Sequence, residues 1–159
     1  MFARHHESSA LLNASVEESF AYLDDFRQLS SHMARPSAMM AGSRMAIETD
    51  ERDGRAVGSE VRMSGSMLGM RLALEEVVVE REPPLRKTLD ARLVVIGQYR
   101  LGFELESAGA ATRARIFIDY ALPEKAPARL LGRLFGKSYA RWCTERTAKD
   151  AVRHFDKRA

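Results

Sequence analysis

The sequence has few of the residues that bind metals or act as nucleophiles, with one cysteine and four histidines among 159 residues. Cys143 has no second cysteine to pair with, and its place on the apolar side of a predicted helix indicates an inert, buried thiol. The histidines do not have the spacing of metal ligands with Cys143 or with one another on one helix face. They are His5, His6, His32 and His154. We therefore expect no disulfide, no metal site and no cofactor.

The sequence also lacks a long hydrophobic run. No apolar stretch approaches the roughly 18 residues that a membrane-spanning helix needs, and the first six residues contain no hydrophobic signal core. We therefore expect a cytoplasmic protein. Apolar residues make up 45% of the chain, and there is no internal repeat or low-complexity linker. This composition predicts a single domain covering residues 1–159.

The longest periodic segment extends from Pro127 to Phe155. Its apolar residues recur at spacings of three and four, which predicts a helix about 40 Å long with a wide apolar face. Such a face has to be buried against another part of the chain. It consists of Leu130, Leu131, Leu134, Phe135, Tyr139, Trp142, Cys143, Val152 and Phe155.

Two short helices are predicted near the start of the chain. Ser15 and Glu18 have the spacing of a capping box, in which each side chain bonds a free backbone N–H at the start of a helix. A second helix is expected to begin at a cap formed by Asp24 or Asp25 and to end before Pro36.

Alternating apolar and polar residues predict strands in most of the remaining chain. Asp53-Gly54 is a strong hairpin signal, so the strands on either side of it should be antiparallel. The apolar phase changes from Leu74 to Val77 across Glu75-Glu76, and a β-bulge there would keep both sets facing the core. The strands expected are 8–13, 44–50, 57–67, 70–81, 85–93, 95–106 and 112–122. Since no helix separates the later strands, the class is α+β with an antiparallel sheet.

This order of elements, with Ser15-Val16-Glu17-Glu18-Ser19-Phe20 leading to Leu23-Asp24-Asp25, resembles the START/Bet v 1-like (SRPBCC) superfamily, also called the polyketide cyclase/dehydrase and lipid transport group. The resemblance spans the whole chain. It implies a helix-grip fold, in which a curved antiparallel sheet of about seven strands surrounds a long C-terminal helix. Two short helices then lie between the first and second strands, and an apolar cavity separates the sheet from the last helix. Members of this group include lipid carriers and aromatic cyclases, so the resemblance implies binding or carriage of a small hydrophobic ligand.

Methionine is concentrated in one part of the chain. Seven of the eight methionines lie between residues 33 and 70. Flexible thioether side chains suit a pocket that adapts to apolar ligands, although they also fill gaps in an ordinary core. The side chains that we expect to line the cavity are Met33, Met63, Met67, Tyr99, Leu101, Phe103, Tyr120, Leu131, Phe135, Tyr139 and Trp142.

Catalysis would require an acid and a base inside the cavity. The acidic residues of the predicted strands mostly occupy the polar phase, so the sequence favours a binding protein over an enzyme and indicates no catalytic residue. One alternative is a polyketide-cyclase-like enzyme that uses Tyr99, Tyr120 or His32 as polar groups. Another is an interaction protein with a vestigial cavity. For His32, a position at a helix end or facing solvent is favoured over contact with a ligand.

The charge is unevenly distributed. Between Ala126 and Arg158 there are nine Lys or Arg and three Asp or Glu, a net charge of +6, which leaves −3 for the rest of a chain whose net charge is +3. Every fourth residue from Arg129 to Arg141 is basic. This row is either a solvated face or a surface for weak contact with anionic membranes. Nucleic acid is not expected as a partner, since no aromatic residues interleave the row. The oligomeric state is not indicated.

Overall fold

The computed structural model describes residues 1–67, 69–93 and 97–159, without the side chains of Met67 and Leu93. The start of the strand predicted from residue 95 lies outside these residues. The elements in chain order are β1 (Arg4–Leu12), α1 (Val16–Asp24), α2 (Phe26–Leu29), the 3₁₀ helix η1 (Ser31–Ala34), β2 (Met45–Thr49), β3 (Glu60–Met67), β4 (Met70–Glu82), β5 (Arg86–Leu93), β6 (Gly97–Ala108), β7 (Ala111–Tyr120) and α3 (Ala126–Asp156).

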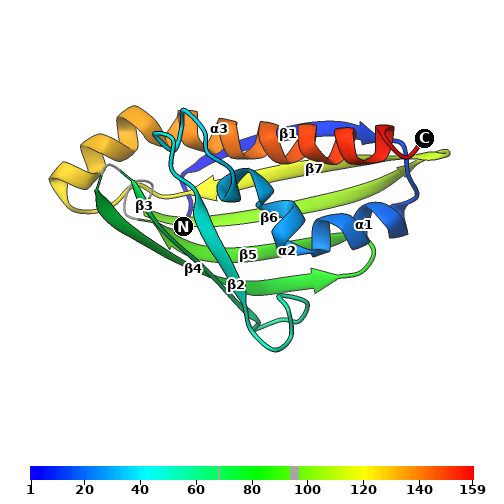
Figure 1. Ribbon diagram of the computed structural model, residues 1–159, viewed down its shortest axis with the longest axis horizontal. Helices are drawn as coiled ribbons and strands as arrows, with labels where there is room; N and C mark the ends of the chain where they lie inside the picture. The colour runs from blue at the N-terminus through cyan, green and yellow to red at the C-terminus, as the bar shows by residue number, and fades with distance from the viewer. Residues whose placement is uncertain (68, 94–96) are drawn as a thin grey trace.

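The strands form one antiparallel sheet in the order β1-β7-β6-β5-β4-β3-β2. All helices lie on one face of this curved sheet, and α3 runs along β1 and β7 (Figure 1). The core lies between that face and the helices. The predicted α+β helix-grip architecture is therefore confirmed, and short helices lie between the first and second strands as expected.

The local signals at the start of the chain act as predicted. Ser15 and Glu18 form a capping box at the start of α1. The Asp25 carboxylate caps α2 by accepting a hydrogen bond from the Arg27 N–H. The predicted second helix is divided into α2 and η1, and the backbone N–H of Ser30 bonds to the Phe26 carbonyl between them.

The connection between β2 and β3 is longer than the sequence predicts. The two strands are antiparallel and the chain turns at Asp53-Gly54, as predicted, with positive φ at both residues, but the connection extends over residues 50–59. The Asp50 carboxylate stabilises the longer loop by accepting hydrogen bonds from the Ser59 hydroxyl and from the backbone N–H groups of Gly54 and Glu60.

The predicted bulge at Glu75-Glu76 is misplaced. Alternation along β4 continues unbroken through Leu74, Glu76 and Val78, all of which are buried. Val79 is 39% exposed, and the register shifts only between Val78 and Glu80. The strand therefore carries a carboxyl group into the core, and the later bulge turns Arg81 toward the interior.

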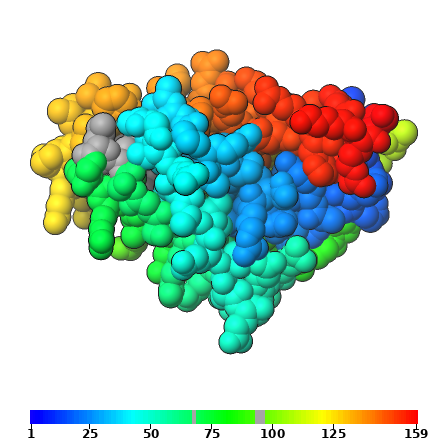
Figure 2. Space-filling model, in the orientation of Figure 1, coloured from blue at the N-terminus to red at the C-terminus, as the bar shows by residue number. Residues whose placement is uncertain are grey.

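The prediction for the apolar face of α3 is wrong for its first turns. Leu130, Leu131, Leu134 and Phe135 are 46–62% exposed. The buried side of α3 consists mostly of small residues, which allow the helix to approach the sheet closely. It includes Gly132, Gly136, Ala140, Cys143, Thr144, Thr147, Ala148 and Ala151. In the space-filling view, the first turns of α3 (gold) form one end of the molecule (Figure 2).

Candidate ligand-binding site

A cleft opens where β4 and β5 separate. The pairing of these strands extends from Glu82↔Arg86 to Glu76↔Ala91. In the described part of the chain, residues 70–75 of β4 pair with β3 and not with β5. The space between the two strands forms a cleft of about 740 Å³.

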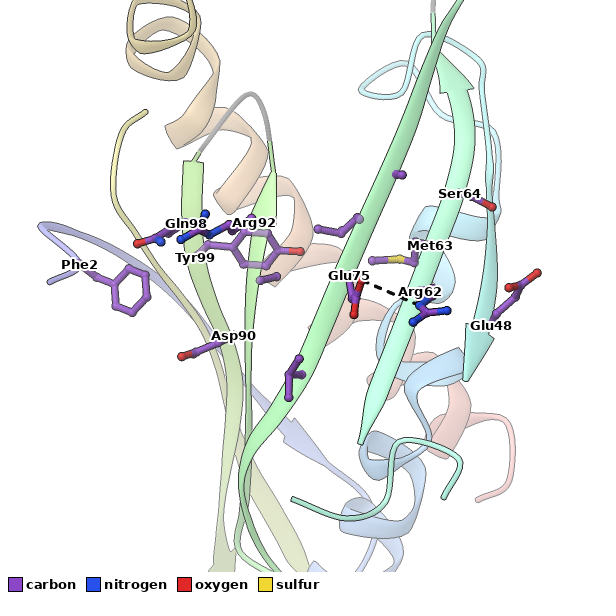
Figure 3. A pocket seen from close by; sticks show the side chains of 14 residues that line it. Phe2, Glu48, Arg62, Met63, Ser64, Glu75, Asp90, Arg92, Gln98 and Tyr99 are labelled. Carbon is purple, nitrogen blue, oxygen red and sulfur yellow. Dashed lines mark ion pairs between the residues drawn. The ribbon is translucent and has the colours of Figure 1, made fainter. Parts of the chain in front are cut away.

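The lining of the cleft changes from polar outside to apolar inside. Its inner part is formed by Met63, Leu74, Ala91 and Tyr99, all of which are buried core residues. Figure 3 shows Tyr99 on one side of the opening and Met63 on the other. The outer part contains Phe2, Glu48, Arg62, Ser64, Glu75, Asp90, Arg92 and Gln98.

Ion pairs hold the polar side chains at the outer rim. Arg100 of β6 makes two hydrogen bonds to Asp90 of β5, at 2.6 and 2.9 Å. On the other side, the Arg62 guanidinium lies 3.9 Å from the Glu75 carboxylate. The guanidinium of Arg100 also packs on the Phe2 ring, 5.4 Å from its centroid. The rim is charged on both sides, so it stays hydrated while the inner part of the cleft is apolar.

Glu76 is 1% exposed and does not itself line the cleft, but it is a neighbour of three lining residues, Leu74, Ala91 and Tyr99. Ala91 lies directly opposite it on β5, and Val61 lies opposite it on β3. The Tyr99 hydroxyl donates a hydrogen bond to Glu76 Oε1. Glu76 Oε2 is buried and has no partner among the described residues. A carboxyl group with one unpaired oxygen in an apolar environment is costly for stability, which marks the position as a candidate site.

The pKa values of this cluster follow from its burial. Burial raises the pKa of Glu76 to about 7, although the Tyr99 hydrogen bond and the charge of Lys87 act in the opposite direction. Burial also raises the pKa of Tyr99 and of Tyr139 well above the ordinary range. Burial raises the pKa of the Cys143 thiol as well, which agrees with the predicted inert thiol. Only Glu76 can gain and lose a proton near neutral pH here.

A second group of buried charges has its partners satisfied. Asp24, at the end of α1, accepts hydrogen bonds from Arg81 at 3.0 and 2.9 Å and from Lys87 Nζ at 3.0 Å. Lys87 Nζ also donates to the Asp24 backbone carbonyl at 2.7 Å. This cluster ties α1 to β4 and β5, and the Asp24 carboxylate is shared by the buried Lys87 and the partly exposed Arg81.

His32 lies in the last turn of η1, as the predicted helix-end position requires, but it is buried and does not face solvent. Its ring packs edge-on against Trp142, with centroids 4.9 Å apart, and its Nδ1 has no partner among the described residues. Burial lowers the pKa of His32 to about 4. The ring is therefore neutral at physiological pH.

The structure separates the predicted cavity residues into several groups. Met63 and Tyr99 line the cleft, and Tyr120 lies opposite Tyr99 on β7. Met33, Leu101 and Phe103 are packed in the core, while Tyr139 and Trp142 are half-buried beside η1. Leu131 and Phe135 are 46% and 53% exposed. The side chain of Met67 lies outside the described residues.

Glu76 is the residue that sequence reasoning missed. Its signal was the spacing of Leu72, Leu74, Glu76 and Val78, which places a glutamate in phase with apolar residues.

In the described residues, no three His, Cys, Asp or Glu side chains are grouped to hold a metal ion. Within the same residues, no helix has both the length and the apolar character to cross a membrane.

Comparison with solved structures shows that the chain has the START/Bet v 1-like fold. Zhui aromatase/cyclase from Streptomyces sp. R1128 is similar with a TM-score of 0.71 and 12% identity, over 98% of this chain and 94% of that one. A START superfamily protein from Mycobacterium smegmatis is similar with a TM-score of 0.60 and 16% identity, over 98% of this chain and 99% of that one. Ginseng major latex-like protein 151 from Panax ginseng is similar with a TM-score of 0.59 and 14% identity, over 96% of this chain and 97% of that one. No family model and no curated protein matches the sequence.

Proposed function

We propose that this protein binds a small hydrophobic ligand in its interior, through the cleft between β4 and β5. The observation that carries the proposal is the apolar inner part of the cleft, formed by Met63, Leu74, Ala91 and Tyr99. The whole cleft, including its polar rim, has a volume of about 740 Å³, which lies within the range of small-molecule sites. The fold is shared with an aromatase/cyclase and a START superfamily protein, which supports the same class of ligand.

Titration with ethylnaphthalene, an apolar fluorescent probe, tests this proposal. We expect saturable binding to the wild type and at least about tenfold weaker binding to Met63→Trp, because the larger ring fills the inner cleft. Val57→Trp is the matched control, since Val57 is 57% exposed and lies outside the cleft. Circular dichroism confirms that both variants are folded. Equal affinity of the two variants would contradict binding in this cleft.

A second candidate is a polyketide-cyclase-like enzyme. The observation that favours it is the buried Glu76–Tyr99 pair, since an ionised Glu76 could remove a proton from the carbon beside a ketone while the phenol orients the carboxylate. The test is deuterium exchange at that carbon of acetylnaphthalene, followed by NMR. Catalysis predicts exchange in the wild type that Glu76→Gln abolishes. No acceleration over buffer leaves the protein a binder.

We also propose that the first turns of α3 contact anionic membranes, from which an apolar ligand can be taken up. Leu130, Leu131, Leu134 and Phe135 are exposed. Arg129, Arg133 and Lys137 are exposed on the same turns. Each basic side chain near an anionic surface contributes about 1 kcal/mol, and the leucines and phenylalanine can enter the interface. In a dimer of two such helices, the basic residues would repel one another, so a lipid surface fits this face better.

Co-sedimentation with vesicles of phosphatidylserine and phosphatidylcholine at low salt tests membrane contact. We expect the wild type to pellet and both Leu131→Ser/Leu134→Ser and Arg133→Glu/Arg141→Glu to remain in the supernatant. Val57→Ser/Leu85→Ser removes two exposed apolar side chains elsewhere and should pellet like the wild type. Absence of wild-type binding contradicts the proposal. A dimer that only the Leu131/Leu134 variant abolishes would instead show that a second copy covers this face.

A further inference from the structure

Glu76 is a buried carboxyl group with an apolar environment on its own sheet. Val61, Leu74, Val78 and Ala91 surround it on β3, β4 and β5, and each is at most 8% exposed. A leucine would fit this position better if the core only had to be filled. The carboxyl group therefore needs an explanation beyond packing.

The hydrogen bond to Tyr99 determines which carboxyl oxygen remains available. The Tyr99 hydroxyl donates to Glu76 Oε1, so Oε1 acts as an acceptor. Oε2 has no partner among the described residues. When the carboxyl group is protonated, the proton resides on Oε2 and can be donated to a further acceptor. An acceptor without a hydrogen of its own, such as a carbonyl oxygen, complements this arrangement.

The inner lining of the cleft borders Glu76. Leu74, Ala91 and Tyr99 line its inner part. All three are neighbours of Glu76: Leu74 lies two residues away on β4, Ala91 lies opposite on β5, and Tyr99 is its hydrogen-bond partner. Glu76 itself is 1% exposed, so a ligand has to enter between these side chains to meet its carboxyl group.

We propose that Glu76 is the polar recognition group of the cavity and that its protonated carboxyl group donates a hydrogen bond to the carbonyl oxygen of an apolar ligand. The inference rests on the proposed ligand-binding function and adds a ligand class, namely apolar ketones, quinones, aldehydes or esters. Tyr99 is a positioning residue, because its hydrogen bond to Oε1 holds the carboxyl group with Oε2 available.

The surrounding titratable groups are compatible with a protonated Glu76. They are Tyr99 from β6, Lys87 from β5, and Tyr139 and Cys143 from α3. The two phenols and the thiol stay neutral near neutral pH, because burial raises the pKa of each. Lys87 is the one cation among them, and Asp24 neutralises it at 3.0 Å. Burial therefore dominates and raises the pKa of Glu76 to about 7.

The test compares three probes with the same ring system: acetylnaphthalene, its alcohol naphthylethanol, and the hydrocarbon ethylnaphthalene. Affinities are measured by calorimetry between about pH 5 and pH 9, a range that spans the neutral region where a raised carboxyl pKa titrates. We expect the wild type at low pH to bind the ketone about three- to tenfold more tightly than the hydrocarbon, as a buried hydrogen bond allows. This preference should decrease above about pH 7 as Glu76 ionises.

Two substitutions at position 76 separate hydrogen bonding from packing. Glu76→Gln keeps an acceptor for Tyr99 and carries a permanent N–H donor, so the ketone preference should persist and become independent of pH. Glu76→Leu should bind the hydrocarbon as tightly as the wild type but lose the ketone preference. Binding of the hydrocarbon depends on the cavity and not on Glu76. If the wild type does not bind the hydrocarbon, the proposed function is overturned. The ketone preference tests only the role of Glu76.

Two results would overturn the assignment of Glu76. One is an equal ketone preference in the wild type and Glu76→Leu, because the donor would then lie elsewhere. The other is a preference for the alcohol that grows as the pH rises, because an ionised Glu76 would then accept a hydrogen bond from a ligand hydroxyl.

Discussion

The interior contains two buried carboxyl groups whose environments differ. Asp24 lies where α1 meets β4 and β5, and Arg81 and Lys87 satisfy it with hydrogen bonds of 2.9–3.0 Å. Burial alone would raise its pKa, but the hydrogen bonds from Arg81 and Lys87 lower the pKa below its ordinary value. Glu76 lies where β4 leaves β5, has Tyr99 as its one hydrogen-bond partner among the described residues, and has a pKa raised to about 7.

The difference separates a structural acid from one that is available to a ligand. At the Asp24 end the strands are paired and each charged group has an ion-pair partner. At the Glu76 end the strands separate, a cleft reaches the core, and one carboxyl oxygen is unpaired among the described residues. We therefore expect substitutions near Asp24 to change mainly stability and substitutions near Glu76 to change mainly binding.

The largest effect is expected for Asp24→Asn. The substitution leaves Lys87, which is 0% exposed, without its counterion, so unfolding should become easier by about 3–5 kcal/mol in urea titration. The double variant Asp24→Leu/Lys87→Met is the control, because it removes the buried pair and leaves without a partner Arg81, which is 25% exposed. It should recover part of the loss. A loss below about 1 kcal/mol in the single variant would show that the pair is exposed in solution.

Phe103→Ala should cost about 3–5 kcal/mol of unfolding free energy, since the ring is fully buried and packs edge-on against Phe20 at 5.7 Å. Met63→Ala, in the inner part of the cleft, should cost about 2 kcal/mol, the low end for a buried methionine. Urea unfolding of the two variants compares the two ends of the core. Equal losses would contradict the difference in packing between them.

The pH dependence of stability should differ between the wild type and Glu76→Gln. Glu76 has a folded pKa of about 7 against an ordinary value of 4.5. Its proton therefore stabilises the fold fully below about pH 4.5, and this stabilisation is lost as the pH rises through about 7. The difference in unfolding free energy between the wild type and Glu76→Gln should change by about 3 kcal/mol between about pH 4.5 and pH 7.

His32 does not obscure that comparison. Because its pKa is lowered to about 4, His32 makes the unfolding free energy increase with pH, the opposite of the effect of Glu76. This contribution is the same in the wild type and in Glu76→Gln, so it cancels when their unfolding free energies are subtracted. The measurement is urea unfolding of both proteins at matched pH values. Parallel pH profiles would show that Glu76 is ionised in the folded protein throughout the window.

The smallest effect is expected for Tyr99→Phe. The substitution removes the hydrogen bond to Glu76 Oε1, so the pKa of Glu76 should rise further and stability should fall by about 1 kcal/mol at neutral pH. Leu105→Met is a matched control in the same strand, because it alters a buried apolar side chain away from Glu76. An unchanged Glu76 pKa in Tyr99→Phe would contradict the pairing.

The order of elements could be predicted from the sequence because local signals decide it. The capping box at Ser15 and the alternation in β6 and β7 depend on neighbouring residues. The site could not be predicted, because the phase of β4 that buries Val77 and Val79 places more apolar side chains in the core than the phase that buries Glu76. Only the partner strands decide this phase, and they are distant in sequence.

The same limit explains the error in α3. Leu131, Phe135 and Trp142 recur with a helical period. This period does not indicate which other part of the chain packs against each turn of the helix. The ring of His32 in η1 packs on Trp142, whereas Leu131 and Phe135 are exposed. The buried side is formed by small residues, which carry little weight in a hydrophobic pattern.

The most direct test of the difference between the two acids is carbon-13 NMR of the side-chain carboxyl groups during pH titration, with and without acetylnaphthalene. We predict a Glu76 pKa near 7 in the free protein that rises further when the ketone binds, because a ligand selective for the protonated form raises the pKa. The pKa of Asp24 should stay below its ordinary value and should not respond to the ketone. A Glu76 carboxyl group that titrates near 4.5, the ordinary value, or that does not respond to the ketone, would contradict the account.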